Sequence, residues 1–488
     1  MMTVENVFLI KEMNMKKILL FLICFLFSLN AYASVQFDID NNEIKKIRTL
    51  FTDFTYVSEN KDLSKDVQEN SALIQPSVPQ EERDNARILV ENIIMKIKQD
   101  LKTTNLFDIM VEGENWKFWE GYNKTENKDE DDMENFILKK YKNVEVDAIL
   151  VGSYEINKKG SIEIKIRLWD VLDERQLFGK YYIAKKNNWS RIGHVIADQI
   201  YASLTGEITG HFDSKIVYIA EIGDPKNRKK RLALVDFDGE NLNYLDTQNN
   251  LVITPVFSQD DKNTIFYVEY KNRMPAKIYQ RNLLDNIVSV VGDFKEMTFS
   301  PSYHPAEEQK MLFSAAKKGI TDIYEINLRN GKSKRLTNTS FIDTTPYYSP
   351  DGEKIVFCSD RSGSQKLYVM DVDGTNVNRI SLARGEYSKP SWSPDGRLIA
   401  FVKVRKGEFF VGVMSPGGEN ERMLISAYLV EGVKWSPNGR YLMYSKQLGA
   451  YGDKSIPYLY VMDILTGYEY KISTPLKEGA TDPDWISK

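Results

Sequence analysis

Cysteine and histidine are nearly absent from this sequence. Its 488 residues include two cysteines, Cys24 and Cys358, and three histidines. Cys24 lies in an N-terminal segment that we expect to be cleaved off, so Cys358 would have no partner for an intramolecular disulfide. The histidines, His194, His211 and His304, share no spacing typical of metal ligands. We therefore expect a fold that is stable without disulfides and a chain that needs no metal or other cofactor.

Motifs of the common catalytic sites are also missing. The chain has no G-x-S-x-G nucleophile elbow, no P-loop and no dinucleotide-binding glycine pattern. Its formal net charge of −4 leaves no excess of lysine and arginine to neutralise the phosphates of a nucleic acid. We therefore expect neither an enzyme of these classes nor a nucleic-acid partner.

Long apolar runs are limited to one, at the N-terminus. Lys16 and Lys17 precede an apolar stretch of 12 residues, 18–29, which is shorter than the roughly 20 residues of a membrane span. The sequence "AYA" ends at Ala33 and has the small-x-small form of a cleavage site. We predict that residues 1–33 are a signal peptide with its true start at Met15. The alternative is an uncleaved anchor. After cleavage we expect an exported monomer without a membrane span.

One motif is abundant. The sequence S-P-D/N-G occurs at Ser349, Ser393 and Ser436, at intervals of 44 and 43 residues. Degenerate copies place His304 and Ser258 in the same register, at intervals of 45 and 46 residues. A period of this length, with strand-like segments in every copy, is typical of propeller blades of four strands.

The motif has a physical reason. Proline at the second position fixes φ at the value that a type I turn needs, and glycine is favoured at the fourth position, where the chain leaves the turn. Each copy is therefore expected to join an inner strand to a second strand. Further β-rich segments complete each repeat, as in "KIVFCSD" and "QKLYVMDVD". One four-stranded sheet cannot bury both of its faces alone, so the repeats must stack.

The C-terminus is predicted to close the ring. Between residues 213 and 247 the pattern supplies three strands and lacks an inner one. The terminal segment "TDPDWIS" resembles an inner strand and can fill this gap, which leaves no exposed sheet edge. We therefore predict an all-β, closed six-bladed β-propeller over residues 210–488.

Residues 34–209 have a different pattern, that of an α/β domain. Apolar residues recur at helical spacing in the stretch 83–110, and again from Trp189 to a C-terminal cap at Gly206. The segments "VDAILVGSYEI" and "SIEIKIRLWDV" predict a hairpin, and "FGKYYIAK" a third strand. Residues 58–80 and 123–135 are expected to form polar loops. The joining stretch 205–211 has few large apolar residues, so we expect residues 212–488 to fold alone.

The arrangement resembles the TolB family. The resemblance rests on "VDAILVGSY", "IRLWDV", "HVIADQIYASLTGEITGHFDSKIVYI", the S-P-D-G repeats and the terminal "PDW". It covers nearly all of the mature chain. It implies a non-enzymatic periplasmic protein of the Tol–Pal system, which serves envelope integrity and cell division. It also implies that the propeller binds the lipoprotein Pal and that the mature N-terminal segment contacts TolA.

The predicted partner site lies at the mouth of the propeller channel, in the loops that lead into the inner strands. The candidate residues are Thr254, Phe299, Asp343, Thr344, Glu386, Tyr387, Glu431, Thr481 and Asp482. One alternative is that these residues only cap the channel. Another is a propeller hydrolase or lyase that holds a metal through the carboxylates among them, Asp343, Glu386, Glu431 and Asp482.

The mature N-terminus is a second candidate site. Val35, Phe37 and Ile39 alternate with polar residues, which is the pattern of a strand with one apolar face. Such a segment can extend the sheet of a partner, which the family resemblance names as TolA. It can also pair with the α/β sheet of its own chain, and the sequence leaves both possibilities open.

Overall fold

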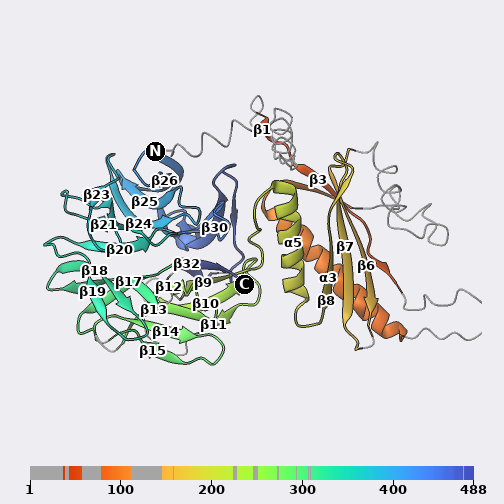
Figure 1. Ribbon diagram of the computed structural model, residues 1–488, viewed down its shortest axis with the longest axis horizontal. Helices are drawn as coiled ribbons and strands as arrows, with labels where there is room; N and C mark the ends of the chain where they lie inside the picture. The colour runs from red at the N-terminus through yellow and green to blue at the C-terminus, as the bar shows by residue number, and fades with distance from the viewer. Residues whose placement is uncertain are drawn as a thin grey trace, which may run out of the picture.

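The computed structural model describes residues 37–38, 43–57, 78–111 and 145–488, apart from 158, 224–227, 246–250, 272–273, 293, 306, 308 and 476. The chain forms an α/β domain beside a β-propeller, and the two helices of the former lie between its sheet and the propeller (Figure 1). The predicted signal peptide, Val35, Ile39, the loop at 123–135 and most of the loop at 58–80 lie outside the described residues.

The α/β domain is built on one mixed sheet with the strand order β5-β3-β6-β7-β8. Strand β3 is parallel to β5 and β6, and β6, β7 and β8 form an antiparallel meander. Short strand β4 pairs with β6, and β1 pairs with β2 apart from this sheet. The strands are β1 (Phe37–Asp38), β2 (Glu43–Ile44), β3 (Ile47–Phe51), β4 (Thr55–Tyr56), β5 (Phe107–Val111), β6 (Ala148–Ile156), β7 (Ile162–Asp170) and β8 (Arg175–Ala184).

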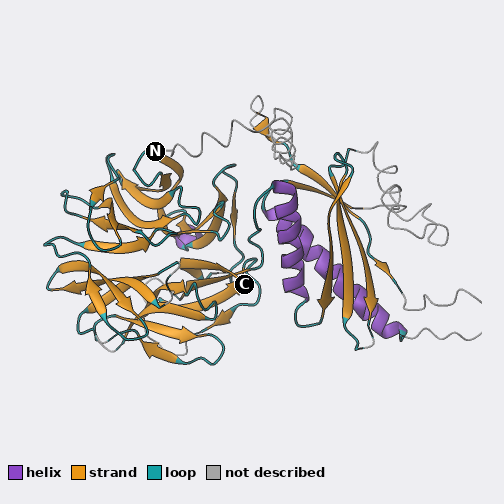
Figure 2. Ribbon diagram, in the orientation of Figure 1, coloured by secondary structure: helices purple, strands orange, loops and turns teal. Residues whose placement is uncertain are grey.

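Two helices, α3 (Gln80–Thr103) and α5 (Trp189–Thr205), lie along this sheet (Figure 2). Their apolar side chains are buried in one cluster with those of the sheet. Helix α5 ends at Thr205 and is capped by Gly206, whose φ of 76° is the left-handed conformation expected there. The prediction of a helix over 83–110 was wrong in its last part. Helix α3 ends at Thr103 because Asn105 adopts a left-handed φ of 58°, and the chain continues as strand β5.

The six-bladed propeller is confirmed: the described part of the chain forms six four-stranded antiparallel sheets. In order from the inner strand outward, blade 1 holds β32, β9, β10 and β11, and the following blades take four consecutive strands each. The strands are β9 (Ser214–Ile222), β10 (Lys229–Asp236), β11 (Asn243–Tyr244), β12 (Leu251–Phe257), β13 (Thr264–Tyr270), β14 (Lys277–Asn282), β15 (Val288–Val290), β16 (Met297–Tyr303), β17 (Lys310–Lys317), β18 (Ile320–Asn327), β19 (Ser333–Arg335), β20 (Asp343–Tyr348), β21 (Lys354–Ser359), β22 (Lys366–Asp371), β23 (Asn378–Arg379), β24 (Glu386–Trp392), β25 (Ile399–Arg405), β26 (Glu408–Met414), β27 (Arg422–Ala427), β28 (Leu429–Trp435), β29 (Tyr441–Gln447), β30 (Tyr458–Asp463), β31 (Glu469–Lys471) and β32 (Gly479–Ser487).

The repeated turn is held by its serine. The Ser393 hydroxyl donates to Oδ1 of Asp395 at 2.6 Å and accepts the backbone N–H of Leu398 at 2.9 Å. The N–H of Gly396 closes the turn on the Ser393 carbonyl at 2.9 Å, with φ of 75° at the glycine. One serine therefore makes hydrogen bonds both within the turn and to the strand that follows it, which explains why the motif recurs in this form.

The C-terminal strand β32 is the inner strand of blade 1. It pairs antiparallel with β9, with Trp485 opposite Ile216. The indole N–H of Trp485 donates to the Ser214 hydroxyl, and its ring stacks on Phe237 with the centroids 5.7 Å apart. The last strand of the chain therefore completes the first blade.

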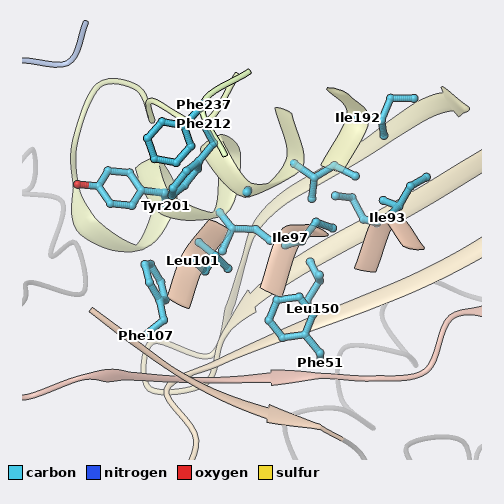
Figure 3. Packing of buried hydrophobic residues seen from close by; sticks show 14 of the residues in the cluster. Phe51, Ile93, Ile97, Leu101, Phe107, Leu150, Ile192, Tyr201, Phe212 and Phe237 are labelled. Carbon is cyan, nitrogen blue, oxygen red and sulfur yellow. The ribbon is translucent and has the colours of Figure 1, made fainter. Parts of the chain in front are cut away.

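The contact between the two parts of the molecule is more apolar than the joining stretch 205–211 indicates. Tyr201 of α5 lies edge-on to Phe212 at 5.8 Å, and its hydroxyl is 3.1 Å from that of Tyr441 in β29. Figure 3 shows Tyr201, Phe212 and Phe237 continuing the cluster formed by the helices. One buried apolar cluster thus spans the α/β domain and the propeller, and separate folding of residues 212–488 stays a prediction.

Candidate binding face of the propeller

The mouth of the propeller is the end at which the chain enters the inner strands. The hairpins between the second and third strands of each blade lie at the same end, and the S-P-D/N-G turns lie at the opposite end. A wide cavity of about 420 Å³ lies at the turn end, with Trp392, Trp435 and Trp485 in its wall. A narrower cavity of about 90 Å³ lies between the middle parts of the inner strands.

A ring of β-bulges surrounds the narrow cavity. Each of the inner strands of the described chain shifts its register by a bulge. The bulged residues have φ between 47° and 66° and are Thr254, Ser300, Thr345, Lys389, Gly432 and Asp482. Proline follows each of them except Gly432. A left-handed residue other than glycine is uncommon and costs about 1–3 kcal/mol, and such strain is often found at binding sites.

Three of the predicted site residues are buried and bonded inside the propeller. Asp343 is fully buried and both of its oxygens accept from Nη2 of Arg361 at 2.9 Å. Tyr387 is fully buried, and its hydroxyl donates a hydrogen bond to Oε1 of Glu421 at 2.8 Å. The third, Thr481, is also buried and donates to Glu221. These side chains are placed to hold the mouth loops together, and contact with a partner would require them to move.

Two other predicted residues, Thr254 and Asp482, line the narrow cavity. The ammonium group of Lys389 lies 2.7 Å from Oδ1 of Asp482. Burial opposes ionisation of Asp482, but the Lys389 charge outweighs it and holds the pKa of that carboxyl below its ordinary value. Asp482 is therefore a carboxylate that already has a cation beside it.

The remaining predicted residues differ in their exposure. Glu386 is exposed at the mouth, and Phe299, Thr344 and Glu431 are partly buried. Among the described residues no three His, Cys, Asp or Glu side chains come together as metal ligands. Two of the carboxylates proposed for a metal, Asp343 and Asp482, are each paired with a cation of the chain itself. The geometry of the described residues therefore favours a binding face over the metal-dependent alternative.

Exposed apolar side chains at the mouth were missed by the sequence reasoning. Large apolar residues stand exposed in the loops and at the strand ends there, and they are Leu251, Met274, Met297, Ile320, Phe341, Ile342, Leu382, Tyr428, Leu448 and Tyr451. The turn end of the described propeller exposes fewer of them, Leu284, Ile287, Val288, Val377 and Leu465. A signal was present in the sequence, because "SFID" and "SLAR" place large apolar residues in loops between strands.

Within the described ranges, no helix has both the length and the apolar character needed to cross a membrane.

Each of the two parts of the chain matches a known domain family. Residues 201–487 match the family described as the TolB beta propeller domain, and residues 65–177 match the TolB amino-terminal domain. The Tol-Pal system protein TolB of Rickettsia bellii (strain OSU 85-389) is 38% identical over 179 residues, which are 37% of this chain and 40% of the relative. Its counterpart in Rickettsia felis is 41% identical over 180 residues, or 36% and 39% of the two chains. The matched region therefore spans less than half of these relatives.

A solved structure resembles this chain over most of its length. The crystal structure of TolB from Acinetobacter baumannii superimposes with a TM-score of 0.71 at 21% sequence identity. The match covers 91% of this chain and 97% of the other. At this identity the likeness concerns the fold, an α/β domain followed by a six-bladed propeller.

Proposed function

This chain belongs to the TolB family, and from that premise we propose that it is a non-enzymatic periplasmic component of a Tol–Pal system. In this role it binds the lipoprotein Pal with its propeller and TolA with its mature N-terminal segment, and so serves envelope integrity and cell division. The names of the matched Rickettsia proteins support the assignment to this system.

The observation that carries the propeller part of the proposal is the collection of exposed apolar side chains at the mouth. A soluble protein rarely exposes many large apolar residues in one region unless that region meets a partner. Leu382 is 76% exposed and Phe341 is 41% exposed, and they lie in the loops that precede two adjacent inner strands, β24 and β20. We assign the Pal-binding face to this end, with the apolar residues as anchors and the polar candidates Thr344 and Glu386 beside them.

Exchange of two anchors for charged residues tests this assignment. In the double variant Phe341→Asp/Leu382→Asp we expect the affinity for the soluble domain of Pal from the same genome to fall at least about ten-fold, because hot-spot anchors each contribute more than about 1 kcal/mol. Calorimetric titration measures the affinity. The matched control is Leu284→Asp/Leu465→Asp at the turn end, where the same charges should leave binding unchanged. Equal loss in both variants, or loss in neither, would contradict the assignment.

The N-terminal part of the proposal rests on the alternating segment at Val35, Phe37 and Ile39. Strand β1 pairs with β2, with Phe37 opposite Ile44, and this small hairpin is separate from the α/β sheet. The described part of the segment, residues 37–38, is therefore paired outside that sheet. A partner strand can replace β2 and retain the main-chain hydrogen bonds, which is the basis of strand addition.

Charge on the apolar face of this segment should weaken TolA binding and spare stability. In Phe37→Asp/Ile39→Asp we expect the affinity for the C-terminal domain of TolA to fall at least about ten-fold, with Tm changed by less than about 2 °C. The control Gln36→Asp/Asn42→Asp adds the same charge to the polar face and should bind normally. Undiminished TolA binding by the first variant would refute the proposal, and a large drop in its Tm would favour pairing within the chain.

A further inference from the structure

Four ionisable side chains meet in the buried contact between the α/β domain and blade 1. Lys96 and Asp100 come from α3, His194 comes from α5, and Asp238 comes from the turn between β10 and β11. Lys96, Asp100 and His194 are each at most 3% exposed. None of them belongs to the binding face at the mouth, and the cluster draws its members from both parts of the molecule.

The contacts of this cluster cross the boundary between the two parts. Nδ1 of His194 lies 2.7 Å from Oδ2 of Asp100, within the α/β domain. Nε2 of His194 points to Oδ2 of Asp238 in the propeller, at 3.6 Å. The Lys96 ammonium bonds the same Asp238 oxygen at 2.6 Å and reaches Glu240 at 2.7 Å. His194 is therefore flanked by one carboxylate from each side of the boundary.

Two glycines fix this arrangement. A Cβ at Gly193 would lie 2.8 Å from Cβ and Cγ of Lys96, so only glycine leaves room for the lysine stem between the helices. Gly239, in the turn that carries Asp238, has φ of 85°, and a Cβ there would lie 1.8 Å from the carbonyl oxygen of Ser473. The turn is thus held between the α/β domain and the loop after β31, and the position of Asp238 is set by backbone packing.

The charge of the cluster depends on one proton. With a neutral imidazole, the Lys96 cation is accompanied by the buried carboxylate of Asp100, the partly buried Asp238 and the exposed Glu240, so the cluster carries a net negative charge. The Nε2 atom of His194 is then buried with no hydrogen-bond partner within range in the described structure. A proton on the imidazole reduces this negative charge and gives each ring nitrogen a carboxylate to bond.

We propose that His194 is a proton-operated latch, which in its protonated form ties α5 to blade 1 through Asp238 and which on deprotonation loosens the α/β domain from the propeller. The observation behind the latch is the geometry of two carboxylates from opposite sides around one buried imidazole. Electrostatics act in the same direction. Burial opposes protonation of His194, but Asp100 and Asp238 outweigh it and raise the pKa of His194 above its ordinary value.

Three elements place further titratable groups near His194. On α3, burial raises the pKa of Asp100, and its contact with His194 couples the titrations of the two groups. On the β10–β11 turn, burial opposes ionisation of Asp238, but its bond from Lys96 keeps its pKa below the ordinary range. On β31, burial holds the pKa of Tyr470 well above its ordinary value, so this phenol stays neutral.

One more group on α5 titrates nearby and needs a control. Burial raises the pKa of Asp198 to about 7, although its oxygens accept the N–H groups of Phe212 and Asp213 at 2.7 and 2.9 Å. Both Asp198 and the Asp100–His194 pair bind a proton more tightly in the folded than in the unfolded chain. Their contribution to stability is present at low pH and is lost as the pH rises through the folded-state pKa, which for His194 lies above about 6.5.

The latch can be tested with two readouts on the mature full-length chain. The chain has three histidines, so nuclear magnetic resonance of the imidazoles can follow each titration. Energy transfer between dyes at Lys159→Cys and Glu353→Cys reports the distance between the α/β domain and the propeller. Cys358 is buried and does not compete for the dyes. Between about pH 6 and about pH 9, we expect the transfer efficiency to change with the same midpoint as His194.

The variants separate the latch from its neighbours. We expect His194→Gln to abolish the pH dependence of energy transfer and Asp238→Asn to lower the His194 midpoint. Asp198→Asn should retain the transition. Docked molecules are those in which the α/β domain contacts the propeller as in this structure. As His194 loses its proton, the ratio of docked to undocked molecules should fall about ten-fold for each pH unit by which docking raises the pKa of His194. The latch is overturned if energy transfer stays constant while His194 titrates, or if the transition persists unchanged in His194→Gln. It is equally overturned if His194 does not titrate in this range.

Discussion

Removal of residues 481–488 will unfold the whole propeller. The deleted strand β32 is the inner strand of blade 1, so its loss exposes the edge of β9 and opens the ring between blades 1 and 6. It also removes Trp485, which is 4% exposed, stacks on Phe237 and bonds Ser214. Since truncation of one buried aromatic side chain costs about 3–5 kcal/mol, Trp485→Ala alone should remove a large part of the roughly 5–15 kcal/mol that stabilises a folded domain.

Urea denaturation followed by circular dichroism measures this effect. The control variant Trp485→Phe keeps an aromatic ring in the same place and should lose less stability than Trp485→Ala. If the truncated protein unfolds at the same urea concentration as the complete chain, ring closure by β32 is not what stabilises the propeller.

The second large effect is expected at Arg440, the residue after the S-P-N-G turn of blade 6. Its guanidinium donates from Nε and Nη2 to Oδ2 of Asp463 at 3.0 and 2.8 Å, and Nη1 reaches Glu207 of the joining stretch at 3.3 Å. Asp463 is fully buried and Arg440 is 6% exposed. Arg440→Met leaves a buried carboxylate without its cation and should lower the free energy of unfolding by about 3–5 kcal/mol.

The repeat supplies a matched control for this variant. Arg397 occupies the same position after the turn of blade 5, but its side chain is 84% exposed and pairs with Asp395 on the surface. Arg397→Met should therefore change the free energy of unfolding by at most about 1 kcal/mol. The double variant Arg440→Met/Asp463→Leu removes both buried charges and should regain stability relative to Arg440→Met. Equal effects at Arg397 and Arg440 would show that burial of the pair is unimportant.

Local and repeated features were the ones that the sequence could predict. The turn that begins at Ser393 is closed by atoms within five residues of each other, so its chemistry is visible in a short stretch and its period gives the blades. The end of α3 was placed seven residues too late, at Met110, because nothing in the local apolar pattern marks Asn105 as left-handed. The apolar contact of Tyr201 with Tyr441 joins residues 240 apart and has no local signal.

The exposure of the candidate site residues was harder to predict than the fold, for a related reason. Residue type and position in a loop do not tell whether a side chain faces solvent, since that depends on what the neighbouring blades place above it. Tyr387 is the second residue of an inner strand and is fully buried, and the ammonium groups of Lys366 and Lys403 lie 5.1 and 4.7 Å from the centre of its ring. Leu382, five residues earlier, is mostly exposed. Binding of Pal by the propeller, and the polar residues that would contact it, stay predictions.

The place of β32 in blade 1 also has a consequence for the order of folding. A ribosome delivers residues 479–487 after the other propeller strands, whereas their partner β9 is among the first propeller segments to appear. Trp485 and Ser214 are 271 residues apart, and contacts of such long range form slowly. Until they form, the nascent propeller presents the unpaired edge of β9, where proteases and chaperones can recognise it. Closure therefore distinguishes a chain translated through residue 487 from one that ended before β32, because only the former can hide that edge.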